Sequence, residues 1–339
     1  MPMKRVRIEE AVGLPLAYDL TKIVPGYKGA VFRRGHIIRP EDLPELRAIG
    51  KAEVVVFDLE PGFLHEDDAA RRLAEAIAGD GLEIKMPGEG WADVVAQVAG
   101  LLKVDADRLE KFNGVGEVEI ATLHNNTPVK AGQVVAKCKV LGLIVAEEEV
   151  RRVEAGSRPA GILKILPFTK RRIGLIVTGN EVAGGLVKDR FTDLVASRLA
   201  EYDSEIGWRT VLPDQPETIA QEIRSQVAAG AEMVIVTGGL SPDDTTPLAI
   251  RSAGVKIISH GAPVSPGAMF LLGELEGRPV LGVPAGALAK PRSVFDLVLP
   301  RLLAGETLTR RDLIRYGHGG ICLGCTPCIF PHCAFGKGS

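Results

Sequence analysis

Aromatic residues make up only 5% of this 339-residue chain, which weakens any stacking platform for single-stranded nucleic acid. Neither sign of charge is in excess, because 41 basic side chains stand against 43 acidic ones and the net charge is −2. Bulk electrostatics therefore predict no binding to nucleic acid or to membranes. No apolar run reaches the length of a membrane span, and Met1–Arg7 lacks the apolar stretch of a leader peptide. We expect a cytoplasmic protein.

Hydrophobic residues are plentiful at 46%, enough to fill sizeable cores, and the chain length predicts at least two domains. The sequence pattern divides the chain into three parts. Residues 1–168 have the pattern of a mixed α+β part, residues 169–305 that of an α/β domain, and residues 306–339 form a cysteine-rich tail.

Residues 169–305 alternate short apolar runs with stretches of helical periodicity. This alternation predicts a mostly parallel, doubly wound sheet with helices on both faces, which is a three-layer domain. Glu276-Gly277 is expected to turn a hairpin, and Asp214 is expected to cap a helix. The predicted strands are 172–177, 208–212, 233–236, 256–259, 269–272 and 279–283, and the main helices are 190–202, a helix after Asp214, and 289–303.

Polar, glycine-containing loops follow three of these strands. They are Thr178–Glu181, Thr237–Asp244 and Pro284–Gly286. Because the carboxyl ends of parallel strands share one edge of a sheet, we expect the loops to converge on a ligand-binding crevice. The pair Gly238 and Gly239 would let a phosphate or a ring approach backbone N–H groups closely. Taken singly, each loop is more often only a tight connection between a strand and a helix.

The second loop also carries two carboxylates, Asp243 and Asp244, which could ligate a hard cation or act as a base. Together and in this order, the motifs resemble the molybdopterin-binding domain shared by the molybdopterin molybdotransferases (molybdenum insertases) and the molybdopterin adenylyltransferases. The matching motifs are Ile176–Glu181, Asp189, Val211–Asp214, Thr237–Ser241 with Asp244, Pro263–Ala268 and Gly282–Gly286.

This resemblance implies a site and its ligands. Molybdopterin would lie across the loops, molybdate would be handled with it, and Asp189 and Asp244 would be the catalytic acidic pair. Since molybdate and the pterin phosphate are both anions, carboxylates near them imply a bridging Mg²⁺. Related insertases are dimers, so a homodimer is implied as well. The residues implied to bind the cofactor are Thr178, Gly179, Glu181, Gly238, Gly239, Ser241, Pro284 and Gly286.

The motifs depart from the insertase pattern in two places. Asp189 is followed by Arg-Phe where the family usually has Ser/Thr-Asn, and Pro284 opens Pro-Ala-Gly-Ala where Pro-Gly-Asn-Pro is common. Two function classes therefore stay open. One is an enzyme that inserts molybdate into molybdopterin, and the other is a non-catalytic carrier or redox-sensing delivery protein for a client molybdoenzyme. Competence-damage-type nucleotide hydrolases share the domain, but their additional C-terminal domain is not expected here. The fold could also bind another phosphorylated ligand.

The part before residue 169 is less regular. The segment from Gly29 to Val56 resembles the one that precedes the cofactor domain in the molybdotransferases. Helical spacing of apolar residues predicts helices at 66–79 and 91–102, and the pattern changes to β structure from Gly116 to Val145.

Four of the five cysteines, Cys322, Cys325, Cys328 and Cys333, are concentrated near the C-terminus. Their Cys-x2-Cys-x2-Cys-x4-Cys spacing would let the thiolates converge on one metal ion or cluster. The first three match the bacterial ferredoxin pattern and the fourth comes one residue later. A 4Fe–4S cluster, Zn²⁺ and a metal-free redox-active tail all stay open, while a structural disulfide framework is not expected in the cytosol. We predict that this centre lies outside the main cores.

Overall fold

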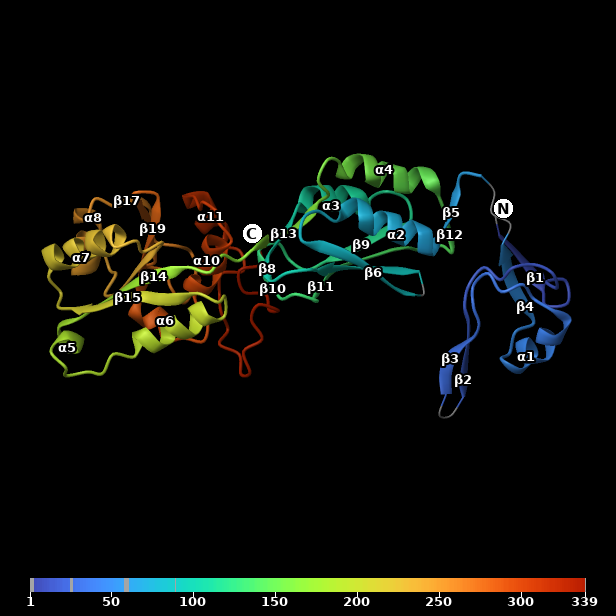
Figure 1. Ribbon diagram of the computed structural model, residues 1–339, viewed down its shortest axis with the longest axis horizontal. Coiled ribbons are helices and arrows are strands. Elements are labelled where there is room, and N and C mark those ends of the chain that lie inside the picture. The colour runs from blue at the N-terminus through green and yellow to red at the C-terminus, as the bar shows by residue number, and fades with distance from the viewer. Residues whose placement is uncertain (1–2, 25–26, 58–60, 89, 339) are drawn as a thin grey trace. The chain divides into compact units, whose positions relative to one another are not determined.

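The structure is a computed structural model that describes residues 3–24, 27–57, 61–88 and 90–338. Contacts divide the chain into two compact units, which we describe separately. The first comprises Met1–Val98, Leu102–Leu123 and Val129–Ile165, and the second comprises Ala99–Leu101, His124–Pro128 and Leu166–Ser339. The second unit therefore holds both the segment predicted as an α/β domain and the predicted tail (Figure 1).

A six-stranded sheet forms the centre of the second unit, with the strand order β15–β14–β16–β19–β18–β17. The first four strands in this order run parallel, and β18 is antiparallel to both of its neighbours. The reversed strand arises from the predicted hairpin, where Glu276 and Gly277 adopt φ values of 52° and 74°. The strands are β14 (Arg172–Thr178), β15 (Glu205–Leu212), β16 (Val234–Gly238), β17 (Lys256–His260), β18 (Leu271–Leu275) and β19 (Arg278–Pro284).

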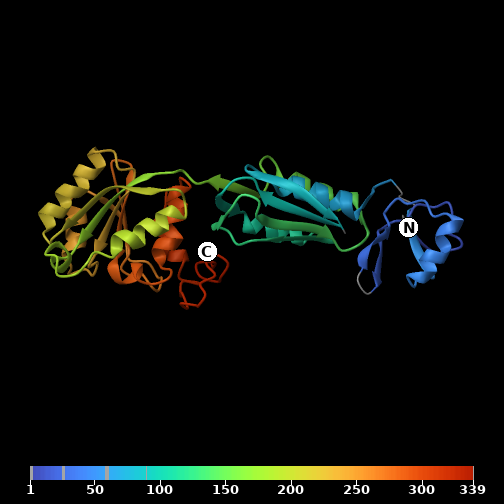
Figure 2. The same ribbon diagram turned by 60° about the horizontal axis from the view of Figure 1, so that its bottom comes forward.

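Both faces of this sheet are covered by apolar side chains. Leu175 and Val177 of β14 belong to one core, and Ile176 between them belongs to the other. Since successive side chains of a strand point to opposite faces, a continuous apolar run suits a strand between two layers of helices. The three-layer prediction is confirmed (Figure 2). Helices α6 (Phe191–Ala200) and α10 (Val294–Leu303) contribute to the first core, and α7 (Pro216–Ala228) and α8 (Thr245–Ser252) to the second.

Two predicted helix starts in this unit are wrong. The helix predicted from residue 289 is divided into α9 (Ala285–Leu288) and α10, and Ser293 caps α10 by accepting the N–H of Phe295. The helix after Asp214 begins at Pro216, and the Asp214 carboxylate does not cap it. Instead, this carboxylate accepts the N–H of Asn180 at 3.2 Å, and the Asp214 N–H donates to the Asn180 side chain at 3.0 Å. Asp214 thus joins two strand-end loops.

The C-terminal segment 306–339 packs on the α/β domain, although the sequence predicted that it would lie outside the main cores. Leu308, Leu313, Tyr316 and Phe335 are buried in the same core as one face of β14. The short helix α11 (Arg310–Arg315) carries Leu313 into that core. The segment therefore completes the domain rather than following it.

Arg301 of α10 anchors this segment. Its side chain is only 7% exposed, and its guanidinium donates to Glu306 at 2.6 Å, to Asp312 at 2.8 Å and to the Tyr316 hydroxyl at 3.3 Å. Burial alone would raise the pKa of Asp312, but hydrogen bonds from Thr309 and Arg301 lower it to about 2. A charge buried this deeply is tolerated because it is paired on several sides.

The first unit begins with a small β part. Strand β1 (Met3–Arg7) pairs antiparallel with β4 (Glu53–Phe57), and β2 (Leu20–Val24) pairs antiparallel with β3 (Tyr27–Phe32). The 3-10 helix η1 (Pro40–Asp42) and helix α1 (Leu43–Ala48) follow β3. The core of this part includes Leu16, Ile38, Leu46 and Val54.

A four-stranded sheet, β6–β7–β11–β9, forms the rest of the first unit together with its helices. Helix α2 (Glu66–Ile77) has the predicted position. The helix predicted at 91–102 is wrong, because these residues form β7 and the start of β8. The remaining elements are β5 (Phe63–His65), β6 (Leu82–Gly88), β7 (Trp91–Ala96), β8 (Gly100–Val104), α3 (Ala106–Asn113), β9 (Val118–Thr122), β10 (Thr127–Val129), β11 (Val134–Val140), β12 (Ile144–Ala146), α4 (Glu147–Ser157), β13 (Leu163–Pro167) and, in the second unit, α5 (Asn180–Ala183).

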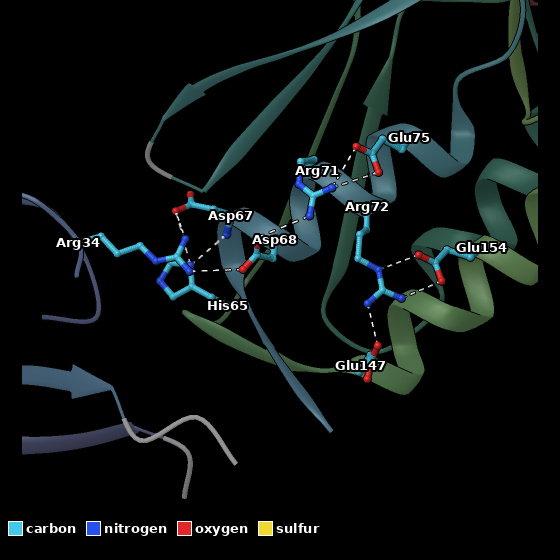
Figure 3. Close-up of polar contacts among 9 residues, drawn as sticks. All are labelled: Arg34, His65, Asp67, Asp68, Arg71, Arg72, Glu75, Glu147 and Glu154. Atoms are coloured by element: carbon cyan, nitrogen blue, oxygen red, sulfur yellow. Dashed lines mark hydrogen bonds and ion pairs between the residues drawn. The ribbon is translucent and has the colours of Figure 1, made fainter. Parts of the chain in front are cut away.

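Charged side chains on α2 tie this helix to its neighbours within the first unit (Figure 3). Arg72 forms ion pairs with Glu147 and Glu154 of α4, each at 2.8 Å. At the start of α2, Asp67 pairs with Arg34 at 2.6 Å, which attaches the small N-terminal β part. In the described ranges, no helix combines the length and the hydrophobicity needed to cross a bilayer.

Candidate functional site

The carboxyl ends of β14, β16 and β19 lie side by side in the sheet. Val177 is the register partner of Thr237, and Gly238 is the partner of Pro284. The three glycine-containing loops identified in the sequence therefore start from adjacent positions on one edge. This placement is what the parallel strand order dictates, and it brings Thr178, Gly238 and Pro284 together.

Gly238 and Gly239 are closely surrounded by side chains of the same domain. A Cβ at Gly238 would overlap the hydroxyl oxygen of Thr178, and a Cβ at Gly239 would lie 2.7 Å from the carboxylate carbon of Asp244. The Thr178 hydroxyl in turn lies 3.1 Å from that of Thr246. The glycine pair thus allows the loop to fold against its own side chains, which differs from the close ligand approach that the sequence suggested.

Gly286, which the sequence placed in the third loop, lies in the short helix α9 that follows β19 directly, and its surroundings differ. A Cβ built on it would meet no atom within 4 Å, and its φ lies outside the left-handed region. Neither packing nor backbone conformation of the free protein requires glycine at this position. Its backbone is therefore open to a ligand on the side where a Cβ would project. Next to the glycine pair, the buried Thr237 hydroxyl has no hydrogen-bond partner among the described residues.

Asp244 closes the second loop on itself. Its carboxylate accepts the backbone N–H of Ser241 at 2.6 Å, and its own N–H donates to the Ser241 carbonyl at 2.9 Å. The Ser241 N–H was predicted to bind the cofactor. In the free protein the Asp244 carboxylate occupies this donor, so an anionic ligand would have to compete with it.

Asp189 has a different environment. Its carboxylate accepts the backbone N–H groups of Phe191 and Thr192 at the start of α6, the Thr192 hydroxyl, and the Arg209 guanidinium at 2.8 Å. Burial would raise the pKa of Asp189, but these bonds from Thr192 and Arg209 lower it. Arg209 comes from within β15, whereas Asp244 faces the loop after β16. The predicted acidic pair thus consists of one helix-capping carboxylate and one loop carboxylate.

The first loop contributes Gly179 and Glu181. Gly179 has φ of 145°, a conformation that favours glycine, and it precedes the short helix α5. The Glu181 side chain is exposed, and its backbone carbonyl accepts the N–H groups of Leu186 and Val187. The carboxylate of Glu181 is therefore available at the surface of this loop.

His260 is a residue of this edge that the sequence reasoning missed. It ends β17, and its Nδ1 lies 3.2 Å from the Arg251 guanidinium, which can only donate. The proton of a neutral imidazole is then on Nε2, which donates to the Leu240 carbonyl at 3.0 Å. His260 thus supports the Gly238–Asp244 loop from the edge strand β17. Its position at a strand end was the one signal in the sequence.

The four tail cysteines line one small cavity of about 70 Å³. Cys322 and Cys333 are partly buried against the α/β core, whereas Cys325 and Cys328 are exposed. In the part of the chain that the structure describes, their thiols do not form a preassembled metal-binding group. The fold gathers the four sulfurs around a common space without arranging them as ligands.

Comparison with known families assigns the α/β domain. Residues 174–304 match the family described as a probable molybdopterin binding domain, which confirms the resemblance found in the motifs. Residues 5–58 match a domain of unknown function (DUF8806).

Comparison with individual proteins gives shorter or weaker likenesses. A CinA-like protein of a Mycobacterium species (strain JLS) is 40% identical over 77 residues, 22% of this chain and 18% of that protein. A CinA-like protein of Mycobacterium tuberculosis is 32% identical over 90 residues, 26% of this chain and 21% of that protein. The chain thus spans about a fifth of the length of the curated relatives that it matches.

Among solved structures, the molybdopterin biosynthesis enzyme MoaB of Thermus thermophilus has a TM-score of 0.32 and 19% identity, covering 40% of this chain and 98% of that one. The molybdopterin biosynthesis protein MoeA of Pyrococcus horikoshii has a TM-score of 0.34 and 15% identity, covering 89% of this chain and 75% of that one. Both TM-scores are below 0.5, so the fold assignment stands on the sheet order described above.

Proposed function

We propose that the second unit binds molybdopterin at the carboxyl edge of its sheet and acts in molybdenum cofactor biosynthesis. The observation that supports this proposal most directly is Gly286 in the first turn of α9, whose backbone lies open within the matched family domain although nothing in the free protein requires glycine there. The pterin would lie across Thr178–Glu181, Gly238–Asp244 and Pro284–Gly286. The accessible backbone of Gly286 could donate hydrogen bonds to a phosphate, and the polar residues after the other two strands could contact the ring system.

The proposed chemistry is insertion of molybdate into the bound molybdopterin. Asp244 is the carboxylate that would act on it, because it belongs to one of the three segments across which the pterin would lie, which we call the proposed pterin groove. Mg²⁺ would bridge Asp244 and the anionic ligands, since a carboxylate next to an oxyanion otherwise repels it. A homodimer and a client molybdoenzyme are further proposals that rest on the family resemblance. The cysteines would hold a metal centre, either Zn²⁺ or an iron–sulfur cluster.

One observation favours the alternative function, a non-catalytic carrier of the cofactor. Asp189 is engaged by the start of α6 and by Arg209, so its carboxylate has little capacity left for a metal or a proton transfer. A carrier needs the groove but not an acidic pair. Anaerobic purification followed by extraction of bound pterin and metals separates the two functions, because pterin with one equivalent of molybdenum indicates handling of the finished cofactor.

Gly286→Ala tests the groove. Replacing an unstrained helical glycine should raise the free energy of unfolding by about 0.5–1 kcal/mol, since the new Cβ meets no protein atom. The same Cβ should weaken molybdopterin binding by about tenfold or more, close to 1.4 kcal/mol, measured by titration against the wild-type chain. If the stabilised variant binds molybdopterin as tightly as the wild-type chain, the pterin does not contact Gly286.

Asp244→Asn tests the chemistry. The variant keeps an oxygen that can accept the Ser241 N–H, so we expect the fold and pterin binding to persist. If Asp244 acts in proton transfer or metal binding, molybdate insertion should fall by about 10²-fold or more. Asp189→Asn is the matched control: its amide oxygen can still accept the Phe191 and Thr192 N–H groups, so stability should fall by no more than about 1 kcal/mol through the lost ion pair with Arg209. If both variants keep full activity in a molybdate-dependent assay, the two carboxylates have no catalytic role, and the non-catalytic carrier function is favoured.

A further inference from the structure

The tail pairs directly with a loop of the groove edge. The Ser265 N–H donates to the Gly320 carbonyl, and the Cys322 N–H donates to the Ser265 carbonyl, each at 2.8 Å. Ser265 lies between the end of β17 and the start of β18, and both of these strand termini are on the carboxyl edge of the sheet. The first cysteine of the tail is therefore one hydrogen bond away from a loop on the same edge as the three pterin-binding loops.

A second connection comes from the other wall of the cysteine cavity. Pro291 and Arg292 line this cavity, and they follow α9, the short helix that contains Gly286. The Arg292 guanidinium lies over the ring of Phe330 at 4.8 Å, between Cys328 and Cys333 in sequence. The cavity is thus enclosed by the tail on one side and by the residues that follow α9 on the other.

The end of the tail is held by the buried Phe335 and by the Gly336 N–H, which donates to the Gly319 carbonyl at 2.9 Å, whereas the stretch between Cys322 and Cys333 has little regular structure. Between residues 320 and 338, the described part of this tail, it contains no helix and only the single parallel bridge between Ile321 and Ser265. Cys325 and Cys328 are exposed on this irregular segment, so they can move inward without disrupting a helix or a strand. Short irregular segments of this kind gain their order from a bound metal, whose binding energy becomes ordering energy.

We propose that Cys322, Cys325, Cys328 and Cys333 bind one metal centre that controls the pterin groove. On binding, the four thiols lose their protons to solvent and form metal–sulfur bonds, which draws Cys325 and Cys328 toward Cys322 and Cys333. The closed tail then holds Ser265 and Arg292 in place, and with them two loops of the groove edge. Metal occupancy should therefore raise the affinity of the groove for molybdopterin, a consequence that rests on the proposed function.

The first test is metal binding by the full chain. Zn²⁺, and separately Fe³⁺ with sulfide and a dithiol reductant under anaerobic conditions, are added to metal-free protein, and bound metal and acid-labile sulfide are measured after desalting. We expect one centre per chain, lost in the Cys325→Ser/Cys328→Ser variant. Cys138→Ala is the matched control, because Cys138 is buried in the first unit, where burial raises its thiol pKa to about 12. Labile sulfide identifies a cluster, and zinc without sulfide identifies a Zn²⁺ site. No stoichiometric metal in either arm would overturn the proposal.

The second test is the coupling. Amide hydrogen exchange in residues 261–270 should slow by about fivefold or more on metal loading, and should not change in the Cys325→Ser/Cys328→Ser variant. Molybdopterin affinity of the wild-type chain should rise by a similar factor. Metal binding with unchanged exchange would refute the coupling and leave pterin binding intact. Slowed exchange in a chain that binds no pterin with or without metal would instead refute the proposed function while the metal-controlled loop stands.

Discussion

A chain that ends at Gly305 should lose the stability of its α/β domain. The deletion removes Leu308, Leu313, Tyr316 and Phe335 from the core. Loss of a large buried side chain typically costs about 2–5 kcal/mol, and a whole domain is stable by only about 5–15 kcal/mol. The deletion also removes Glu306, Asp312 and Tyr316, the partners of the buried Arg301 guanidinium. Unfolding of the second unit at ordinary temperature, followed by calorimetry, is the expected result.

A chain that ends at Gly319 is the matched control for this deletion. It retains α11, Tyr316 and the partners of Arg301, and it lacks all four tail cysteines and Phe335. We expect this shorter deletion to fold with a lowered melting temperature. Leu323→Ser, at a position that is 84% exposed, should change stability by no more than about 0.5 kcal/mol. If the chain ending at Gly305 melts like the full chain, the C-terminal segment is not part of the core.

Gly238→Ala should destabilise the domain and abolish pterin binding together. Its new Cβ overlaps the hydroxyl of Thr178 at the end of a central strand, where both neighbouring strands fix the backbone. Overpacking of this kind costs about 1–3 kcal/mol, and relief requires a shift of the loop that begins at this residue. Chemical denaturation and molybdopterin titration of the same preparation measure the two effects.

Thr178→Ala provides the test of this explanation. Removing the hydroxyl leaves space for the new Cβ, so the double variant Gly238→Ala/Thr178→Ala should be more stable than the sum of the single effects predicts. A rescue of about 1 kcal/mol or more would show that the clash is the cause. Additive losses would mean that Gly238 is needed for another reason, such as the Thr246 hydroxyl, which lies 3.3 Å from the position of the new Cβ.

The sheet and its helices could be predicted because local and tertiary requirements agree there. The apolar run of β14 is long enough for a strand and too short for a helix, and burial on both faces asks for no polar alternation. The hairpin at Glu276-Gly277 was predictable from Gly277, which adopts the required positive φ without steric cost, whereas Glu276 takes its positive φ as an exception for a residue with a side chain.

Residues 91–102 show where this agreement fails. Their apolar residues recur at helical spacing, but the first half pairs as β7 with β6 on one side and β11 on the other. The pairing partners of this strand include residues far away in the sequence, and the local sequence of residues 91–102 does not reveal them. The prediction that Asp214 caps a helix failed in the same way, because Asn180 of another loop engages its carboxylate.

The candidate site was predicted as a set of positions but not as a set of roles. The parallel sheet was enough to place the three loops on one edge. The state of each carboxylate depends on neighbours that the motifs do not contain, namely Arg209 for Asp189 and the Ser241 N–H for Asp244. The burial of the C-terminal segment could not be predicted from the sequence either, because its few core side chains are separated by polar and glycine residues and form no periodic pattern.

Because strand β18 runs in the reverse direction, the turn that follows it lies at the opposite end of the sheet from the proposed pterin-binding loops. Since β18 and β19 form a hairpin, the turn at Glu276-Gly277 lies on the rim opposite to Pro284 and to the β17–β18 loop. The turn is therefore a natural insertion point for a fluorescent reporter or an affinity tag, where foreign residues extend into solvent away from every groove loop of this unit.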